Sequence, residues 1–563
     1  MLRFHYSLAA MAVLFMLKPV TASACGGFFC NNSAPVNQAA ERILFHVGAD
    51  GTVTAVIQIQ YEGPSESFAW VLPVSGTPEV AVSSDQIFTR LQNATNPQYT
   101  VVRTIEGDCD DDARTFAGGA DSGTAFEGDE NGAPGVNVEA SGSVGPYDFA
   151  VISVDPALTN AADVAIEWLS DEGYDLSAIT GDVLGPYLES GLNLIAFRLT
   201  KGSEADAGSI RPIMLTFGQG LPSIPLRPTA VAADPNMGVL VWTLGPARAI
   251  PVNYRSLELN EALINWLNPG PTYNAVVTAA ADEAGGQGFV TEMAGSVRDV
   301  ADAVFPGIET AALEQARGQA GSDADNASIV SELLAALAGA DGLLDAVESS
   351  IPLAEGVSAG DLVGCPFCTS DFIDQSADFD LDAFLNEVEV RVVAPVEDTA
   401  TLFEEQLYLT RLYTTMSPAD MTLDPSFDFN AELGDYSNLH TATQFIECGP
   451  GVSQFDASWR MDIPGADTIR GVGAQWPFDI SSSDQPANAR ILRVGTTGNG
   501  EVIEDNTAVI QQAVSEHNQD VGPTGSLSGG GCSVVHSSQD ATTLGALIAF
   551  AVWFARRRRF HKA

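Results

Sequence analysis

The sequence predicts an α+β fold: a β-rich N-terminal region with interspersed helices, then an alanine-rich helical region, then a second β-containing region. Residues 53–61 (VTAVIQIQY) alternate largely apolar and polar side chains with the period of two expected of a half-buried strand. Residues 328–349 are instead rich in alanine and other helix formers. Residues 387–393 (EVEVRVV) return to strict alternation, which predicts a strand in the second β-containing region.

The β-rich domain is expected over residues 25–256 and opens with a hairpin. Ala49-Asp50-Gly51 is a tight-turn signal between strands predicted at 43–47 and 53–61. Short apolar runs bounded by turn residues predict the later strands. These strands are expected at 68–74, 145–152, 192–200, 213–217 and 238–245.

Helices are expected between these strands. Ser83 or Ser84 is an N-cap for a helix with apolar residues at helical spacing, and Asn160 caps another that Gly173 closes. Residues 221–227 (LPSIPLR) contain prolines that permit only an edge strand or a connector. The apolar face of the first helix consists of Ile87, Phe88, Leu91 and Ala94.

Residues 106–145 are rich in glycine and aspartate and poor in apolar side chains, so we expect a disordered, exposed acidic loop. Its acidic run raises the possibility of a calcium site. Calcium loops alternate their acidic ligands and need a conformational glycine, and this continuous run does not have that spacing. A solvated loop is therefore favoured over calcium binding at Asp108, Asp110, Asp111 and Asp112.

A mainly helical region is expected over residues 257–355, packing on the first domain, with helices at 273–284, 290–304 and 328–349. The second β-containing region is expected over 356–519. Besides 387–393, its predicted strands are 407–413, 467–472 and 490–494.

The chain is strongly acidic, with 73 Asp and Glu residues against 25 Lys and Arg and a formal net charge of −48. Such a surface repels the phosphates of nucleic acids and anionic lipid headgroups. We therefore exclude both as partners of the body of the protein, by which we mean residues 25–519. Because the acidic residues are spread along the chain, solubility is favoured over cation binding as their role.

Residues 1–24 have the pattern of a signal peptide. Arg3 precedes an apolar stretch at 8–17, and Ala22-Ser23-Ala24 is a small-residue cleavage site, so cleavage is expected after Ala24. Cys25 follows directly, which leaves lipid attachment open. Ala22 is a poor match to the bulky residue that a lipoprotein signal needs, so simple cleavage is favoured.

The C-terminal end predicts anchoring. A Gly/Ser-rich spacer at 520–540 precedes an apolar helix at 541–555, whose length of about 22 Å falls short of the roughly 30 Å hydrocarbon core. The basic end at 556–563 is expected in the cytoplasm, with the body outside. The tail is either a single-span anchor or, as we favour, a sorting signal processed at Cys532.

Six cysteines in the body suit an oxidising compartment. The simplest pairs are Cys25 with Cys30 and Cys365 with Cys368, which leaves Cys109 with Cys448. Lipid on Cys25 would break this scheme.

Few residues suggest chemistry. Cys365-Pro366-Phe367-Cys368 resembles a redox dithiol, but the aspartates that follow would raise the thiol pKa, so a structural disulfide is favoured. His46, His440 and His517 do not stand at metal-ligand spacing and are interpreted as packed or surface histidines. Neither a nucleophile elbow nor a phosphate-binding loop occurs in the sequence.

Six segments carry a resemblance to a known family: CGGFFC (25–30), PVNQAAERI (35–43), SFAWVLPV (67–74), GPYD (145–148), NMGVLVW (236–242) and DEAGG (282–286). Together they resemble a secreted bacterial family known as domain of unknown function 2330. That family has no established activity, so the resemblance implies an exported envelope protein and assigns no catalytic residue. The tail resembles the myxobacterial C-terminal sorting signal through Cys532, the apolar run and the four arginines, although residues 533–540 separate Cys532 from the helix.

These observations predict an exported, surface-anchored bacterial protein with a non-enzymatic binding or structural role. Its expected partners are the membrane, through the tail, and an unidentified extracellular ligand or envelope component. No cofactor is expected. The alternative is a tethered extracytoplasmic enzyme, either hydrolytic or thiol-redox through Cys365 and Cys368.

Overall fold

The structure is a computed structural model, and it describes most of the chain between residues 37 and 521. It contains helices and strands in several sheets, which confirms the α+β class. The described ranges are 37–62, 69–108, 136–155, 158, 160–172, 174, 180–199, 211–231, 233–320, 325–374 and 379–521.

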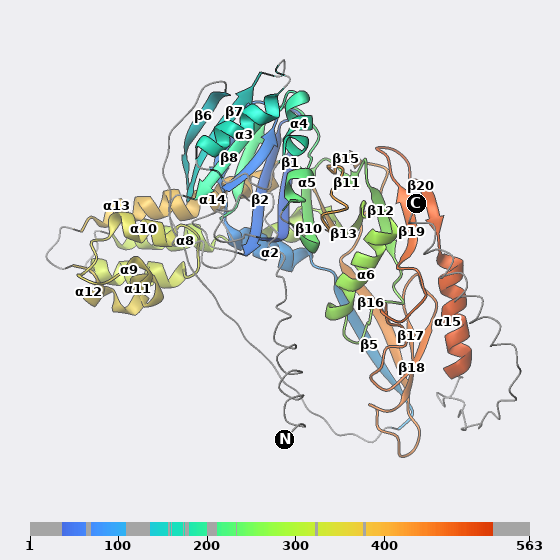
Figure 1. Cartoon of the computed structure of the whole chain (residues 1–563). Coiled ribbons are helices and arrows are strands. Elements are labelled where there is room, and N and C mark those ends of the chain that lie inside the picture. The colour runs from blue at the N-terminus through green and yellow to red at the C-terminus, as the bar shows by residue number, and fades with distance from the viewer. Residues whose placement is uncertain are drawn as a thin grey trace, which may run out of the picture.

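A ten-stranded mixed sheet, here called the large sheet, runs through the middle of the molecule (Figure 1). Its central strands β1 and β10 are parallel neighbours although almost two hundred residues separate them. The strand order is β20-β19-β12-β13-β14-β10-β1-β2-β9-β4. The bounds are β1 Asn37–Val47, β2 Val53–Glu62, β4 Glu79–Val82, β9 Ile213–Phe217, β10 Ala233–Gly245, β12 Arg255–Leu259, β13 Gly288–Ser296, β14 Tyr408–Met416, β19 Asn488–Arg493 and β20 Glu501–Asp505.

Both faces of the large sheet are covered near its centre. Ile43 and Phe45 of β1 pack against a second sheet with the order β3-β8-β7-β6, whereas Leu44 packs against helices α2, α7 and α14. The outer face of the second sheet is covered in turn by α3 and α4. These elements are β3 Ala69–Val74, β6 Val136–Val144, β7 Tyr147–Val154, β8 Asn193–Leu199, α2 Asp85–Thr95, α3 Ala161–Asp171, α4 Gly181–Glu189, α7 Arg298–Val304 and α14 Ala394–Glu404.

A third sheet, β18-β17-β16-β5, lies beside the other half of the large sheet. Helix α15 packs on it, and helix α6 covers strands β12 and β13. Its elements are β5 Gln98–Glu106, β16 Leu439–Glu447, β17 Ser458–Asp462 and β18 Ile469–Val472, with α6 Gly270–Glu283 and α15 Thr507–Val521. Strands β11 (Arg248–Pro251) and β15 (Phe427–Asn430) form a small ribbon, and α5 spans Leu226–Thr229.

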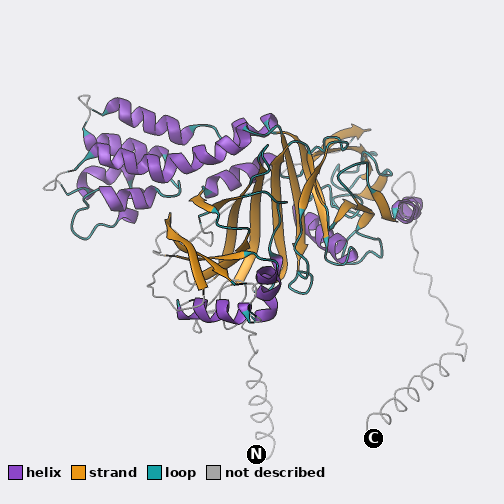
Figure 2. Ribbon diagram, turned by 90° about the horizontal axis from the view of Figure 1, so that it is seen from above, coloured by secondary structure: helices purple, strands orange, loops and turns teal. Residues whose placement is uncertain are grey.

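Residues 308–393 form a helical arm with its own hydrophobic core, which projects to one side of the sheets (Figure 2). The arm is joined to the large-sheet region by side chains: Arg90 of α2 pairs with Glu309, and Ser84 donates to Asp341. The arm consists of α8 Ile308–Gln319, α9 Asn326–Ala336, α10 Leu343–Ser350, α11 Ala359–Gly364, η3 Pro366–Cys368, α12 Thr369–Phe372, α13 Leu381–Val388 and η4 Glu389–Val393.

The strand predicted at 387–393 is wrong, because this segment is helical and continues from α13 through the π-helical turn η4. Val388 and Val392 are buried at helical spacing, whereas Val390 is 67% exposed. Glu387 and Arg391 pair along the helix. Residues four positions apart lie on the same face of a strand and also one turn apart on a helix, so a pattern over seven residues fits both structures. Packing within the arm selects the helix.

This assignment gives a direct test. Replacing Val388 with alanine should lower the free energy of unfolding by about 2 kcal/mol, because two buried methyl groups are lost. Val390→Ala should change it by less than about 0.5 kcal/mol, since that side chain is exposed and alanine is the better helix former. Urea unfolding of the two variants measures the difference. Equal losses at both positions would support the alternating strand instead.

Other expectations differ from the structure in informative ways. The helix predicted at 290–304 is correct only in α7, because Gly288–Ser296 forms the central strand β13. β12 also lies inside the region expected to be helical, and helices continue past residue 355 to residue 404. Part of the loop expected at 106–145 is the edge strand β6, in which Val136, Val138, Ala140 and Val144 alternate with polar residues. The prediction missed this alternation because it treated the whole segment as one acidic, glycine-rich loop.

Several local predictions are confirmed. The first hairpin is β1–β2, with a turn at 48–52. Ser84 caps α2 with its side chain, and Asn160 occupies the N-cap position of α3 without a side-chain bond. Gly173 lies outside the described residues. The predicted strands at 407–413, 467–472 and 490–494 correspond to β14, β18 and β19, while the domain boundaries themselves stay predictions.

Candidate functional site

Two adjoining pockets of about 300 and about 420 Å³ open where the large sheet meets α6 and the third sheet. Pro97, Tyr99, Tyr273 and Glu292 line both, so we treat them as one site and call it the Glu261 pocket, after the acid in the larger part. Its combined size falls in the range of small-molecule sites.

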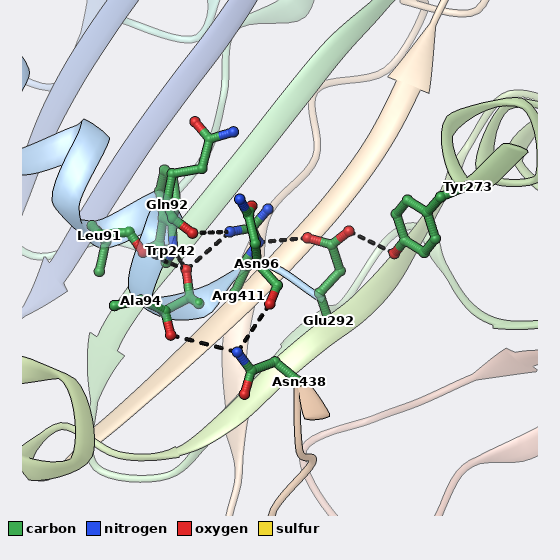
Figure 3. A network of polar contacts seen from close by, with 10 residues as sticks. Leu91, Gln92, Ala94, Asn96, Trp242, Tyr273, Glu292, Arg411 and Asn438 are labelled. Carbon is green, nitrogen blue, oxygen red and sulfur yellow. Dashed lines mark hydrogen bonds and ion pairs between the residues drawn. The ribbon is translucent and has the colours of Figure 1, made fainter. Parts of the chain in front are cut away.

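One wall is built on a β-bulge. Strand β13 pairs Thr291 and Met293 with consecutive residues of β14, so Glu292 is the extra residue of the bulge. A bulge redirects a side chain, and here Glu292 meets Arg411 of β14 with a distance of 2.5 Å between Arg411 Nε and Glu292 Oε2. Tyr273 of α6 donates its hydroxyl hydrogen to the other oxygen at 2.6 Å (Figure 3).

Arg411 is fixed from its other side by helix α2. Its Nη1 donates to Thr95 Oγ1 at 2.9 Å and to the carbonyl oxygen of Gln92 at 3.2 Å. Its guanidinium also lies over the ring of Trp242, the cross-strand neighbour of Arg411 on β10. Because both oxygens of Glu292 are bonded and its charge is neutralised, this group forms a rigid wall of the pocket (Figure 3).

Glu261, which follows β12, differs from Glu292 because no arginine pairs with it among the described residues. Its Oε1 lies 3.6 Å from Nδ1 of His440, too far for a good hydrogen bond. Its buried Oε2 has no hydrogen-bond partner in the part of the chain that the structure describes. Burial raises the pKa of Glu261 to about 7, although a quarter of the side chain remains exposed. Burial likewise lowers the pKa of His440, so that imidazole is neutral near pH 7.

The aromatic wall comes from the parallel pairing of β5 with β16. Tyr99 and His440 are register partners, and their rings stack with centroids 4.6 Å apart. Tyr436 meets His440 edge-on and carries the guanidinium of Arg248 over its ring at 5.5 Å. The buried Nε of Arg248 has no hydrogen-bond partner within residues 37–521 as far as these are described.

The pocket therefore presents an acid that titrates near neutral pH, a neutral imidazole, an arginine with an unbonded N–H, and tyrosine side chains. The pKa of Tyr436 is raised to about 12 by burial and by Glu261, so its phenol stays neutral. Within the described part of the chain, no group of three His, Cys, Asp or Glu side chains is placed to hold a metal ion. The arrangement suits binding of a small polar molecule and proton exchange through Glu261.

The raised pKa of Glu261 predicts a pH effect on stability. The folded state holds the proton up to about pH 7, whereas the unfolded state loses it near the ordinary value of 4.5. The unfolded state therefore binds fewer protons in this window, and the contribution of Glu261 to stability is lost as pH rises from 4.5 through 7. In Glu261→Gln, the melting temperature should depend less on pH between these values than in the control Glu501→Gln, which changes an exposed acid. Parallel curves for the two variants would contradict this.

The cysteines predicted from the sequence lie elsewhere. Cys365 and Cys368 form the expected disulfide, on a short turn of the helical arm remote from the pocket. Cys448 is also disulfide-bonded, and its backbone N–H donates to the carbonyl oxygen of Glu106, three residues before Cys109. Its pairing with Cys109 stays a prediction. Cys25, Cys30, Cys109 and Cys532, the cleavage site at Ala24 and Asp110–Asp112 of the acidic run are outside the described residues.

The three histidines considered in the sequence lie in different surroundings. His46 is buried beside Glu405, and His517 bonds the backbone of Arg470. His440 alone among these three lines the Glu261 pocket, so its interpretation as a merely packed residue was incomplete. Glu261, Arg248 and Glu292 were missed altogether. Their sequence neighbourhoods carry no motif, and the one signal near them was an acidic residue, Glu292, inside the mostly apolar segment 288–296.

The chain was compared with known families, curated proteins and solved structures. A family model described as an uncharacterized protein conserved in bacteria (DUF2330) matches residues 19–412. Neither the curated proteins nor the solved structures gave a match. In the described part of the chain, no helix combines the length and apolar character needed to cross a membrane, and residues 541–555 fall outside that part.

Proposed function

The chain belongs to DUF2330, a family of uncharacterised bacterial proteins, and from this premise we propose that it is an envelope protein whose body binds a small polar ligand in the Glu261 pocket. One observation carries the proposal: the pocket is lined by two ionisable side chains, Glu261 and Arg248, each with a buried polar atom that has no hydrogen-bond partner among the described residues. Buried polar atoms are almost always bonded, so an unbonded pair in one pocket suits a ligand.

The binding proposal is tested by thermal shift of the exported body against a panel of small acids, amines, neutral sugars and zwitterions. A true ligand at a hundredfold excess over Kd stabilises by about 2.7 kcal/mol. The shift should vanish in Glu261→Gln or Arg248→Gln. It should persist in Glu501→Gln and Arg493→Gln, which alter an exposed ion pair. Shifts that are absent, or equal in all variants, would reject the pocket as a binding site.

A second candidate function, hydrolysis, is favoured by the pKa of Glu261 near 7, because a general acid–base works best close to the ambient pH. The other pocket acids are less suited, since Glu292 pairs with Arg411 and Glu258 with Arg490. Incubating the body with a compound identified by thermal shift, followed by mass analysis, tests this function. Turnover that Glu261→Gln abolishes while binding persists would favour the enzyme over the binding protein.

Export and anchoring form part of the proposal. Their support is the signal-like segment at 1–24, the six cysteines of the body, and the tail with Cys532 and four arginines. Mass analysis of the mature protein from cells should give a chain that begins at Cys25 and lacks Arg556–Arg559. Recovery of those arginines would favour a retained single-span anchor over processing at Cys532.

A further inference from the structure

The charges that line the Glu261 pocket are mostly neutralised within the protein. Arg411 pairs with Glu292, and Arg490 Nε lies 2.6 Å from Glu258 Oε2. Arg248 differs, because among the described residues no carboxylate lies within ion-pair distance of it; its Nη1 bonds only the carbonyl oxygen of Gly434. One arginine and one glutamate, Arg248 and Glu261, are therefore left for a ligand.

These two groups stand at opposite ends of an aromatic wall. Arg248 lies over Tyr436, Tyr436 meets the edge of His440 at 6.4 Å between ring centroids, and His440 lies 3.6 Å from Glu261. Two rings thus separate the positive end of the pocket from the acidic end. A free α-amino acid carries both charges on one carbon and cannot contact both ends, whereas a short peptide carries them several bonds apart.

We propose that the Glu261 pocket binds the zwitterion of a short peptide, with the carboxylate at Arg248 and the ammonium at Glu261. The inference rests on the proposed function and specifies the ligand. The backbone amide lies along the tyrosines and His440, whose rings and hydroxyl groups suit a polar, partly flat molecule. The larger part of the pocket, about 420 Å³, has the size of a molecule of two or three residues.

The acid must be ionised to bind an ammonium, so affinity should depend on pH. Around Glu261, His440 has a lowered pKa, and the pKa values of Tyr99 and Tyr436 are raised. Glu258 and Glu292 form ion pairs with Arg490 and Arg411. Affinity should therefore rise from pH 6 to pH 7.5 as Glu261 ionises. A peptide amine stays largely protonated over this range, since its pKa is about 7.7–8.0.

The experiment is calorimetric titration of the wild-type body with alanine, Ala-Ala, N-acetyl-Ala-Ala and Ala-Ala-amide. Ala-Ala should bind, and blocking either terminus should weaken binding roughly tenfold or more, because one charge-assisted bond is lost. Glu261→Gln should bind Ala-Ala and its N-acetyl form alike. Arg248→Gln should bind Ala-Ala and its amide alike. The capped peptides need no variant, so a misfolded variant cannot obscure the result.

Three outcomes would overturn the inference. Equal affinity for free and capped peptides would remove the need for a zwitterion. Tighter binding of alanine than of Ala-Ala would show that the two charges are recognised at one point. If no peptide binds but another polar compound does so in a pocket-dependent way, the short-peptide ligand is wrong while the binding function stands; if nothing binds, both fail.

Discussion

Replacing Arg411 with methionine should lower the free energy of unfolding by about 3–5 kcal/mol, because Glu292 would remain as a buried charge without its partner. Both side chains are nearly fully buried, at 4% and 3% exposure. The change also removes the donor to Thr95 and the cation over Trp242. Chemical denaturation with the disulfides intact measures the loss.

The matched control removes both charges. Arg411→Met combined with Glu292→Leu leaves no unpaired ion, so the double variant should recover a large part of the stability lost by Arg411→Met alone. Replacement of a buried ion pair by apolar side chains is often neutral or stabilising. A double variant less stable than Arg411→Met would show that the charge of Glu292 is not what makes the single change costly.

Gly342→Ala should weaken the joint between the helical arm and the large-sheet region. Gly342 precedes α10 with a φ of 78°, and a methyl group there would overlap the carbonyl oxygen of Arg391 and lie 2.8 Å from Arg211 Nη1. Arg211 is a further side chain that joins the two parts, since it donates to the carbonyl oxygens of Arg391 and Ser83. The left-handed backbone costs about 1–2 kcal/mol, and overpacking adds about 1–3 kcal/mol.

Gly339 provides the control, because its φ of 77° is almost the same but no atom lies within 4 Å of the added methyl. Gly339→Ala should cost only the backbone term. Comparing the melting temperatures of the two variants isolates the steric contribution at the joint. Limited proteolysis should also release the arm more readily from Gly342→Ala. Equal destabilisation by the two substitutions would mean that the contact with Arg391 is unimportant.

The parts of the fold that were predictable are those with local signals. The β1–β2 hairpin has a turn sequence and alternation, although Thr54 and Gln58 proved buried because a central strand is covered on both sides. The segment 387–393 satisfied strand and helix patterns equally. Its packing against the other helices of the arm selects the helix, and a short window of sequence does not contain that information.

The pocket was harder to predict, since its groups come from distant parts of the chain. Tyr99 and His440 become neighbours through parallel pairing of β5 with β16, and Glu292 reaches Arg411 through a bulge. None of these residues has a diagnostic local spacing. The chain has 73 acidic residues, and what marks Glu261 is its place in a pocket together with a buried oxygen that lacks a partner among the described residues. Both are properties of the folded molecule.

The order of strands in the large sheet has a consequence for biogenesis. The family match ends at residue 412, inside β14, yet β19 and β20 complete the sheet beyond β12. A chain crossing a membrane N-terminus first would present β12 with an unpaired edge until residues 488–493 emerged. Non-local pairing of this kind folds slowly and exposes aggregation-prone edges. If the chain is exported as proposed, the large sheet is thus expected to complete its folding only after residues 488–493 have crossed the membrane.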